Sequence, residues 1–426
     1  MMSETMQGAD PVDTAFWHPF AAMGAVRRAE FVLTRGDDVW LFDEGGSRYL
    51  DATASLWCVN VGHGRREIAD AVAAQMRELA TYQTFGDIAN PPALELTRRL
   101  AALAPVPGAK IFLVNGGGDA IDTAAKLARE YFVRTGESER TVLVSREHSY
   151  HGTQGFGTAL AGMPGNRIAA PFVPDVSVVA HDDPAALEAE FERLGPGRVA
   201  AFFAEPVIGA GGVLPPPPGY LERVREICDR HGVLFVVDSV ICGFGRLGDW
   251  FGIERFGVVP DMIVFAKGVT SGYLPLSGVV THERVAAPFW DDPAAAPFRH
   301  GATYSGHPAA CAAALANLDI LEGDGLLKRA EDLEGELHAA LRTLADHPLV
   351  TEVRGGTGVL GALELAPERL GADPTLPARV ARAARERGAL IRPMTSALGF
   401  SPPLTLREEH LDLLVDAVRG GLSAVL

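Results

Sequence analysis

The chain has 426 residues, too many for one simple core, so its length predicts one large domain and a smaller one. Its 38 basic and 54 acidic residues give a formal net charge of −16. A surface of that sign repels nucleic-acid phosphates and anionic lipids, so we expect no nucleic-acid partner and no membrane partner. Four scattered cysteines without a CxxC pair, no run of 18 apolar residues and no signal-peptide pattern favour a cytoplasmic protein with reduced thiols.

The predicted elements begin with "DDVWLFDEGGSRYLDA" (37–52), which reads as a small hairpin sheet. "REIADAVAAQMREL" (66–79) places Ile68, Val72, Met76 and Leu79 on one face, as a helix does. Five short apolar runs then alternate with helix-like stretches: "KIFLV" from Lys110, "TVLV" from Thr141, "VAAFFA" from Val199, "VLFVV" from Val233 and "MIVFA" from Met262. Such runs predict a mostly parallel sheet covered by helices on both faces.

The last third of the chain is rich in helical patterns, from "PAACAAALANLDILE" (308–322) onward, with strand-like pieces such as "GVLGALEL" and a final helix. It predicts a second, α+β domain that the N-terminal hairpin joins. The expected fold is therefore α/β, with a large ligand-binding domain over 61–310 and a small domain built from 1–60 and 311–426.

A polar residue follows each of the five apolar runs: Asn115, His148, Glu205, Asp238 and Lys267. In open α/β sheets, ligands bind just outside the carboxyl ends of the strands. The sequence therefore predicts a site at this edge of the sheet.

Three features describe the ligand of that site. Gly116, Gly117 and Gly118 precede a helix whose free N–H groups suit a phosphate, although the pattern is neither GxGxxG nor a P-loop and also fits an ordinary turn. Lys267 follows a buried strand, where a lysine either snorkels to the edge or acts as a desolvated nucleophile towards a carbonyl. Asp238 caps a turn or pairs with a buried cation. A phosphate, an aldehyde and a basic ring nitrogen together describe pyridoxal 5′-phosphate (PLP).

Several segments resemble the class III aminotransferases of fold type I, most closely the branch that uses ω-amino acids or amines with pyruvate. They are "SLWCVNVGHGR", "HSYHGTQGFG", "FFAEPVIGAGGVLPPPPGYL", "VVDSVICGFGRLG", "PDMIVFAKGVTSGYLPLSGVV" and "HGATYSGHPAACAAAL", and the likeness extends from about residue 17 to 415. The resemblance implies a PLP-dependent enzyme that moves an amino group from an amine or ω-amino acid to a keto acid.

The resemblance also implies a role for each of the following cofactor-binding residues. Lys267 bonds covalently with the cofactor aldehyde, and Asp238 pairs with the pyridine nitrogen. The other contacts are Val240 and Tyr150 on the two faces of the ring, Gly117 and Gly118 at the phosphate, Glu205 near the cofactor as a partner for a mobile arginine, and Thr303 at the phosphate of the neighbouring subunit. The active unit is then a homodimer.

For the substrate, the resemblance implies that Arg392 in "ALIRPM" binds a carboxylate. It also implies that Trp57, Phe20 and Phe85 line the pocket, although the two phenylalanines fit core packing equally well.

Two departures from the family pattern stand at the site. Gly118 lacks the serine hydroxyl that relatives offer to the phosphate, so Gly118→Ser is expected to tighten cofactor retention unless a positive φ at this glycine strains the serine. Ser239 stands where the family has Glu.

Other readings use the same residues. An amino-mutase or a dialkylglycine-type decarboxylase would also need Lys267 and Asp238, and a catalytically silent PLP-fold binding protein would keep the fold. The joint presence of Lys267, Asp238, Tyr150 and Thr303 favours the enzyme.

Overall fold

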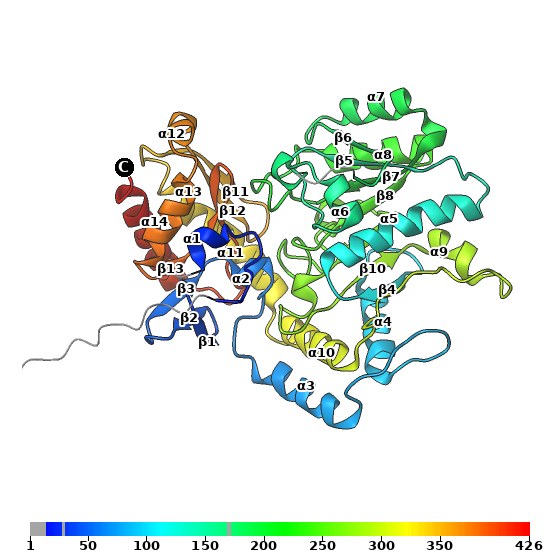
Figure 1. Ribbon diagram of the computed structural model, residues 1–426, viewed down its shortest axis with the longest axis horizontal. Helices are drawn as coiled ribbons and strands as arrows, with labels where there is room; N and C mark the ends of the chain where they lie inside the picture. Colours follow the sequence, from blue (N-terminus) through cyan, green and yellow to red (C-terminus); the bar gives the residue numbers. More distant parts are fainter. Residues whose placement is uncertain (1–13, 28–29, 168–171) are drawn as a thin grey trace, which may run out of the picture.

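The computed structural model describes residues 14–27, 30–167 and 172–426, which form a large and a small lobe (Figure 1). The large lobe is built on a seven-stranded sheet in the order β4-β10-β9-β8-β7-β5-β6. Its strands are β4 (Lys110–Val114), β5 (Val142–Arg146), β6 (Val176–Val179), β7 (Val199–Ala204), β8 (Leu234–Asp238), β9 (Met262–Phe265) and β10 (Ser277–Thr281). β10 runs antiparallel to both of its neighbours, β4 and β9, and the other pairs are parallel, so the predicted mostly parallel sheet is confirmed.

Fourteen helices occur in the described ranges. They are α1 (Met23–Val26), α2 (Ala54–Trp57), α3 (Arg66–Glu78), α4 (Pro91–Leu103), α5 (Gly117–Arg134), α6 (Gly155–Leu160), α7 (Pro184–Leu194), α8 (Tyr220–His231), α9 (Glu283–Trp290), α10 (Pro308–Gly323), α11 (Leu326–Arg342), α12 (Pro367–Ala372), α13 (Leu376–Arg385) and α14 (Glu408–Ser423). No helix in these ranges is both long and apolar enough to cross a membrane.

The central strands are apolar throughout because both faces of the sheet are buried. Side chains alternate along each strand between two separate cores. Phe203 and Val236 join the core that contains α5, whereas Phe202 and Phe235 join the core that contains α8. This two-sided burial is why the sequence shows continuous runs and not alternation.

The predicted helix over 66–79 is α3, but its apolar face is only partly buried. Ile68 is buried and Val72 half-buried, whereas Met76 is 54% exposed. The predicted helix is thus confirmed, and α3 packs on α10 while Met76 stays largely exposed (Figure 1).

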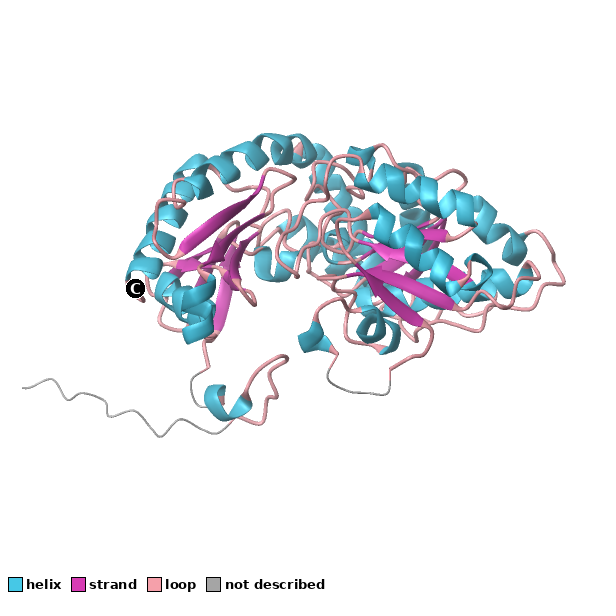
Figure 2. Ribbon diagram, turned by 90° about the horizontal axis from the view of Figure 1, so that it is seen from above, coloured by secondary structure: helices cyan, strands magenta, loops and turns pink. Residues whose placement is uncertain are grey.

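The small lobe contains two further sheets, visible apart from the large one in Figure 2. The first has the order β1-β2-β3-β13 and the second β11-β12-β15-β14. The strands are β1 (Leu33–Asp37), β2 (Trp40–Asp43), β3 (Arg48–Asp51), β11 (Val350–Gly355), β12 (Gly361–Leu365), β13 (Ala389–Leu390), β14 (Arg392–Pro393) and β15 (Ala397–Phe400).

A strand from each end of the chain meets in the first of these sheets. Parallel pairing of β3 with β13 sets Leu50 against Ala389 and links the first 60 residues to the last third. The predicted domain boundary at 310 falls inside α10, which packs on α3 and α4. The boundaries of 1–60, 61–310 and 311–426 stay predictions.

Candidate active site

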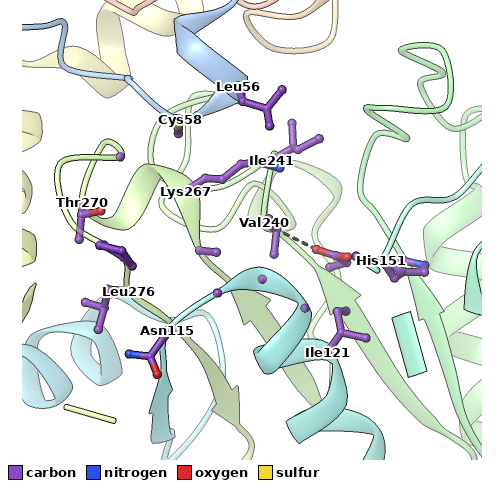
Figure 3. A pocket seen from close by; sticks show the side chains of 18 of the residues that line it. Leu56, Cys58, Asn115, Ile121, His151, Val240, Ile241, Lys267, Thr270 and Leu276 are labelled. Atoms are coloured by element: carbon purple, nitrogen blue, oxygen red, sulfur yellow. Dashed lines mark hydrogen bonds and ion pairs between the residues drawn. The ribbon is translucent and has the colours of Figure 1, made fainter. Parts of the chain in front are cut away.

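A cavity of about 360 Å³ opens where β7, β8 and β9 end and α5 begins (Figure 3). Seven of the residues predicted for the site line it: Gly117, Gly118, Tyr150, Glu205, Asp238, Val240 and Lys267. The topology explains this gathering, because parallel strands bring their carboxyl ends to one edge of a sheet.

Lys267 follows β9 and begins the short 3₁₀ turn Lys267–Val269 with a left-handed φ of +43°. A non-glycine residue in this region is strained, and such strain gathers at functional sites. Its Nζ forms no hydrogen bond or ion pair with any described residue. Burial lowers the pKa of the Lys267 ammonium, and the charge of Asp238 opposes this. The ammonium of Lys267 therefore loses its proton more easily than that of a surface lysine.

Asp238 ends β8 and is held by two donors. Its Oδ2 accepts from Nδ1 of His151 at 2.7 Å, and its Oδ1 accepts from the N–H of Val240 at 3.0 Å. His151 is buried, and its Nε2 has no hydrogen-bond partner among the described residues. A carboxylate fixed in this way can meet a cation from the cavity side without reorienting.

His151 was missed by the sequence reasoning, which took only Tyr150 from "HSYHG". The contact with Asp238 joins residues 87 positions apart. A second histidine in a strand-end loop was the only signal available.

Glu205 follows β7 and is buried. Its carboxylate accepts from the N–H of Tyr150 at 3.1 Å and from the N–H of Gly209 at 2.9 Å. Burial raises the pKa of Glu205, while the charge of His151 and these N–H groups oppose the rise. The side chain thus ties the Tyr150 loop to the loop after β7.

Two glycines at the start of α5 leave room for a ligand and for neighbouring side chains. A Cβ on Gly117 would lie 3.2 Å from Cγ1 of Val240, so the helix start sits directly beside this valine. Gly118 does not have a positive φ, but a Cβ there would lie 2.5 Å from Oε1 of Gln154. The expected obstacle to Gly118→Ser, a left-handed backbone, is therefore absent, and the Gln154 side chain is the obstacle instead.

Five predicted residues, Arg392 among them, lie outside the wall of this cavity. Trp57 is buried in an apolar cluster that also contains the wall residue Ile241. Phe20 is 81% exposed, and Phe85 is 54% exposed beside a second cavity of about 730 Å³. Thr303 is exposed in the loop before α10.

Arg392, on β14, is half-buried, and its side chain forms no hydrogen bond or ion pair with any described residue. Burial lowers the pKa of its guanidinium, and the charge of Tyr150 opposes this. The positive charge of Arg392 also acts on Lys267, which places the guanidinium near the cavity residues. Arg392 is therefore a cation close to the site that pairs with no carboxylate in the part of the chain that the structure describes.

The apolar part of the wall includes residues that the sequence reasoning did not select. Leu56 and Cys58 face Lys267 from the segment after β3, and Ile241 and Leu276 continue the wall (Figure 3). Leu56 belongs to α2, in which Ser55 has a φ of +61°. Leu56, Cys58 and Ile241 adjoin Trp57 or Val240 in the sequence, whereas nothing in the sequence pointed to Leu276.

The arrangement fits PLP. It offers an amine with a lowered pKa, a buried and oriented carboxylate, and a helix start with free N–H groups beside it. Tyr150 and Val240 supply a ring and a branched apolar group in the same cavity.

Known proteins agree with this geometry. The family model described as aminotransferase class-III matches residues 23–421. The chain is 37% identical to a putrescine–pyruvate aminotransferase of Pseudomonas aeruginosa, with 91% of this chain and 89% of that protein covered. It is also 37% identical to an omega-aminotransferase of Caulobacter vibrioides, with 98% and 99% covered.

A solved structure supports the same assignment. An amine transaminase from an uncultivated Pseudomonas species, in its PLP-bound form, superposes with a TM-score of 0.91 at 37% identity and covers 97% of this chain and 99% of its own. The chain therefore belongs to the class III aminotransferases, which are PLP-dependent enzymes of fold type I.

Proposed function

We propose that this aminotransferase takes its amino group from a primary amine or an ω-amino acid and passes it to a keto acid such as pyruvate. The observation that carries this is Arg392, whose side chain has no partner among the described residues and whose charge acts on Tyr150 and Lys267 in a largely apolar cavity. An arginine without a protein partner suits the carboxylate of a keto acid. The apolar wall of Leu56 and Ile241 suits a donor without an α-carboxylate. The relatives named as putrescine–pyruvate aminotransferase and amine transaminase support the same substrate class.

The cofactor roles follow the geometry of the cavity. Lys267 would bond with the aldehyde, and Asp238, held by His151, would pair with the pyridine nitrogen. Tyr150 and Val240 would enclose the ring, and the N–H groups of Gly117 and Gly118 would hold the phosphate. When bound, PLP supplies an electron sink for the electrons left on the substrate carbon that loses its proton.

The residues of the chain handle the proton. The Nζ of Lys267 would be the base that takes the proton from the donor carbon. Its lowered pKa leaves more of it unprotonated near neutral pH, and a positioned base of this kind contributes about 10²–10⁴-fold. The fixed carboxylate of Asp238 would hold the proton on the ring nitrogen. Glu205 holds the Tyr150 backbone, and its carboxylate is the candidate partner for a mobile Arg392.

We also propose a homodimer in the cytoplasm. Thr303 is exposed with its hydroxyl free to reach the phosphate of a neighbouring subunit, and Tyr304 and Phe85 nearby are exposed aromatic residues. The four free cysteines fit a reducing compartment. A Thr303→Ala protein that stays dimeric should lose PLP faster on dialysis.

A substrate panel tests the function. Purified protein is incubated with pyruvate and a series of amines, diamines and ω-amino acids, and alanine is quantified against the carbonyl product. Equal amounts of both products support transamination. Isomerised donor without an acceptor would indicate an amino-mutase, and release of carbon dioxide a decarboxylase. A colourless protein that binds no PLP would indicate a silent homologue.

A further inference from the structure

The start of α5 carries an aspartate close to the proposed phosphate position. Asp119 is the third residue of the helix, and its Oδ2 accepts from the N–H of Gly116 at 3.1 Å. A carboxylate at this position interacts favourably with the positive end of the helix dipole, but it repels a bound phosphate dianion. Its second oxygen, Oδ1, accepts from Nε2 of Gln154 at 2.6 Å. Both oxygens of Asp119 are therefore engaged.

The Gln154 side chain also fills the space that a side chain at position 118 would need. Its Oε1 lies 2.5 Å from where a Cβ of Gly118 would stand, and its Cδ lies 3.0 Å away. The loop that carries Gln154 reaches this close because Gly152 packs on the helix start, where a Cβ would lie 3.0 Å from Cα of Gly118. Glycine at 118 and glutamine at 154 are thus complementary in size.

The chemistry of the carboxamide completes the argument. A carboxylate only accepts hydrogen bonds, so the Gln154 atom that meets Asp119 is the NH₂ nitrogen, which carries two protons. One of these protons forms the hydrogen bond to Asp119, and the other can be donated to a second acceptor.

We propose that Gln154 replaces the hydroxyl missing at Gly118. Its side chain occupies the space of the serine side chain. One N–H of its carboxamide donates to Asp119 and so partly offsets the negative charge of that carboxylate, and the other N–H donates to the phosphate of the bound cofactor. This inference rests on the proposed cofactor roles and goes beyond them by assigning a phosphate ligand outside the helix start.

Cofactor binding to the apoenzyme tests the assignment. PLP and pyridoxal, which lacks the phosphate, are titrated separately into wild type, Gln154→Ala and Gly118→Ser/Gln154→Ala, with Kd read from absorbance. Loss of one hydrogen bond to a charged acceptor predicts a rise of about ten- to a hundred-fold in the Kd of PLP for Gln154→Ala. The Kd of pyridoxal should stay within about twofold. The double variant should recover most of the PLP affinity, because the serine enters the vacated space.

Gln75→Ala serves as the matched control, since Gln75 donates to Leu79 at the end of α3, away from the site. A Gln154→Ala protein with wild-type Kd for PLP would overturn the assignment. So would an equal loss for pyridoxal, because that would mean a disturbed ring site and not a lost phosphate ligand. Because the readout is binding, it can succeed in a protein that fails to transaminate amines, and that failure would count only against the proposed substrates.

Discussion

Arg392 offers the sharpest test of how substrates are held, through the substitution Arg392→Ala. In the structure this half-buried guanidinium has no hydrogen-bond or ion-pair partner among the described residues, and burial lowers its pKa. A bound keto acid would supply the missing carboxylate. A hydrogen bond to a charged group contributes about 1.5–3 kcal/mol, so kcat/KM for pyruvate should fall about ten- to a hundred-fold.

A neutral aldehyde acceptor has no carboxylate and should lose little. The assay is therefore the ratio of kcat/KM for pyruvate to that for an aldehyde of similar size, with one amine donor held constant. Stability gives a second readout. Arg392→Ala leaves no carboxylate among the described residues without its partner, so it should not lower the melting temperature of the apoenzyme. Arg379→Ala is the control, since Arg379 is an exposed arginine paired with Asp373 at 2.8 Å. This substitution should not change the ratio of the two kcat/KM values. Equal losses for both acceptors, or a clear drop in stability, would refute the carboxylate role and indicate a structural arginine.

Three further changes probe the site and the core. Lys267→Ala should reduce turnover by more than about a hundredfold and abolish the absorbance of covalently bound cofactor, while phosphate still binds; full transamination by this variant would contradict the role of Lys267. His151→Phe leaves Oδ2 of Asp238 without its donor and should cost about 1–3 kcal/mol in urea unfolding of the apoenzyme. His151→Asn keeps a donor and should recover part of this, and equal stability of both variants would argue against the hydrogen bond. Burial raises the pKa of Glu254 from 4.5 to about 7, so the stability it contributes is complete below about pH 4.5 and is lost as the pH rises through 7. Glu254→Gln should therefore gain about 1–3 kcal/mol on wild type between pH 5 and pH 8, and a constant difference would show that Glu254 titrates normally.

The sequence by itself determined five of the seven strands of the central sheet and singled out two charged residues that follow them. Strands buried on both faces must be apolar throughout, which is why β4, β5, β7, β8 and β9 stood out as runs. A lysine and an aspartate that end such runs are costly unless they meet a ligand or each other, so Lys267 and Asp238 could be selected from sequence alone. The strands β6 and β10 were not predicted, because "VSVV" and "SGVVT" are short and interrupted by serine or glycine.

Only the tertiary structure decided what surrounds those two residues. The His151 contact with Asp238 spans 87 positions, and the Gln154 contact with Asp119 spans 35. Neither follows from a local pattern, because hydrophobic periodicity reports which face of an element is buried and not which loop packs beside it. The same holds for Gly118, where the family resemblance suggested an empty place for a hydroxyl. Close packing fills such a place with whichever side chain the fold brings there, and here that side chain belongs to Gln154 on another loop.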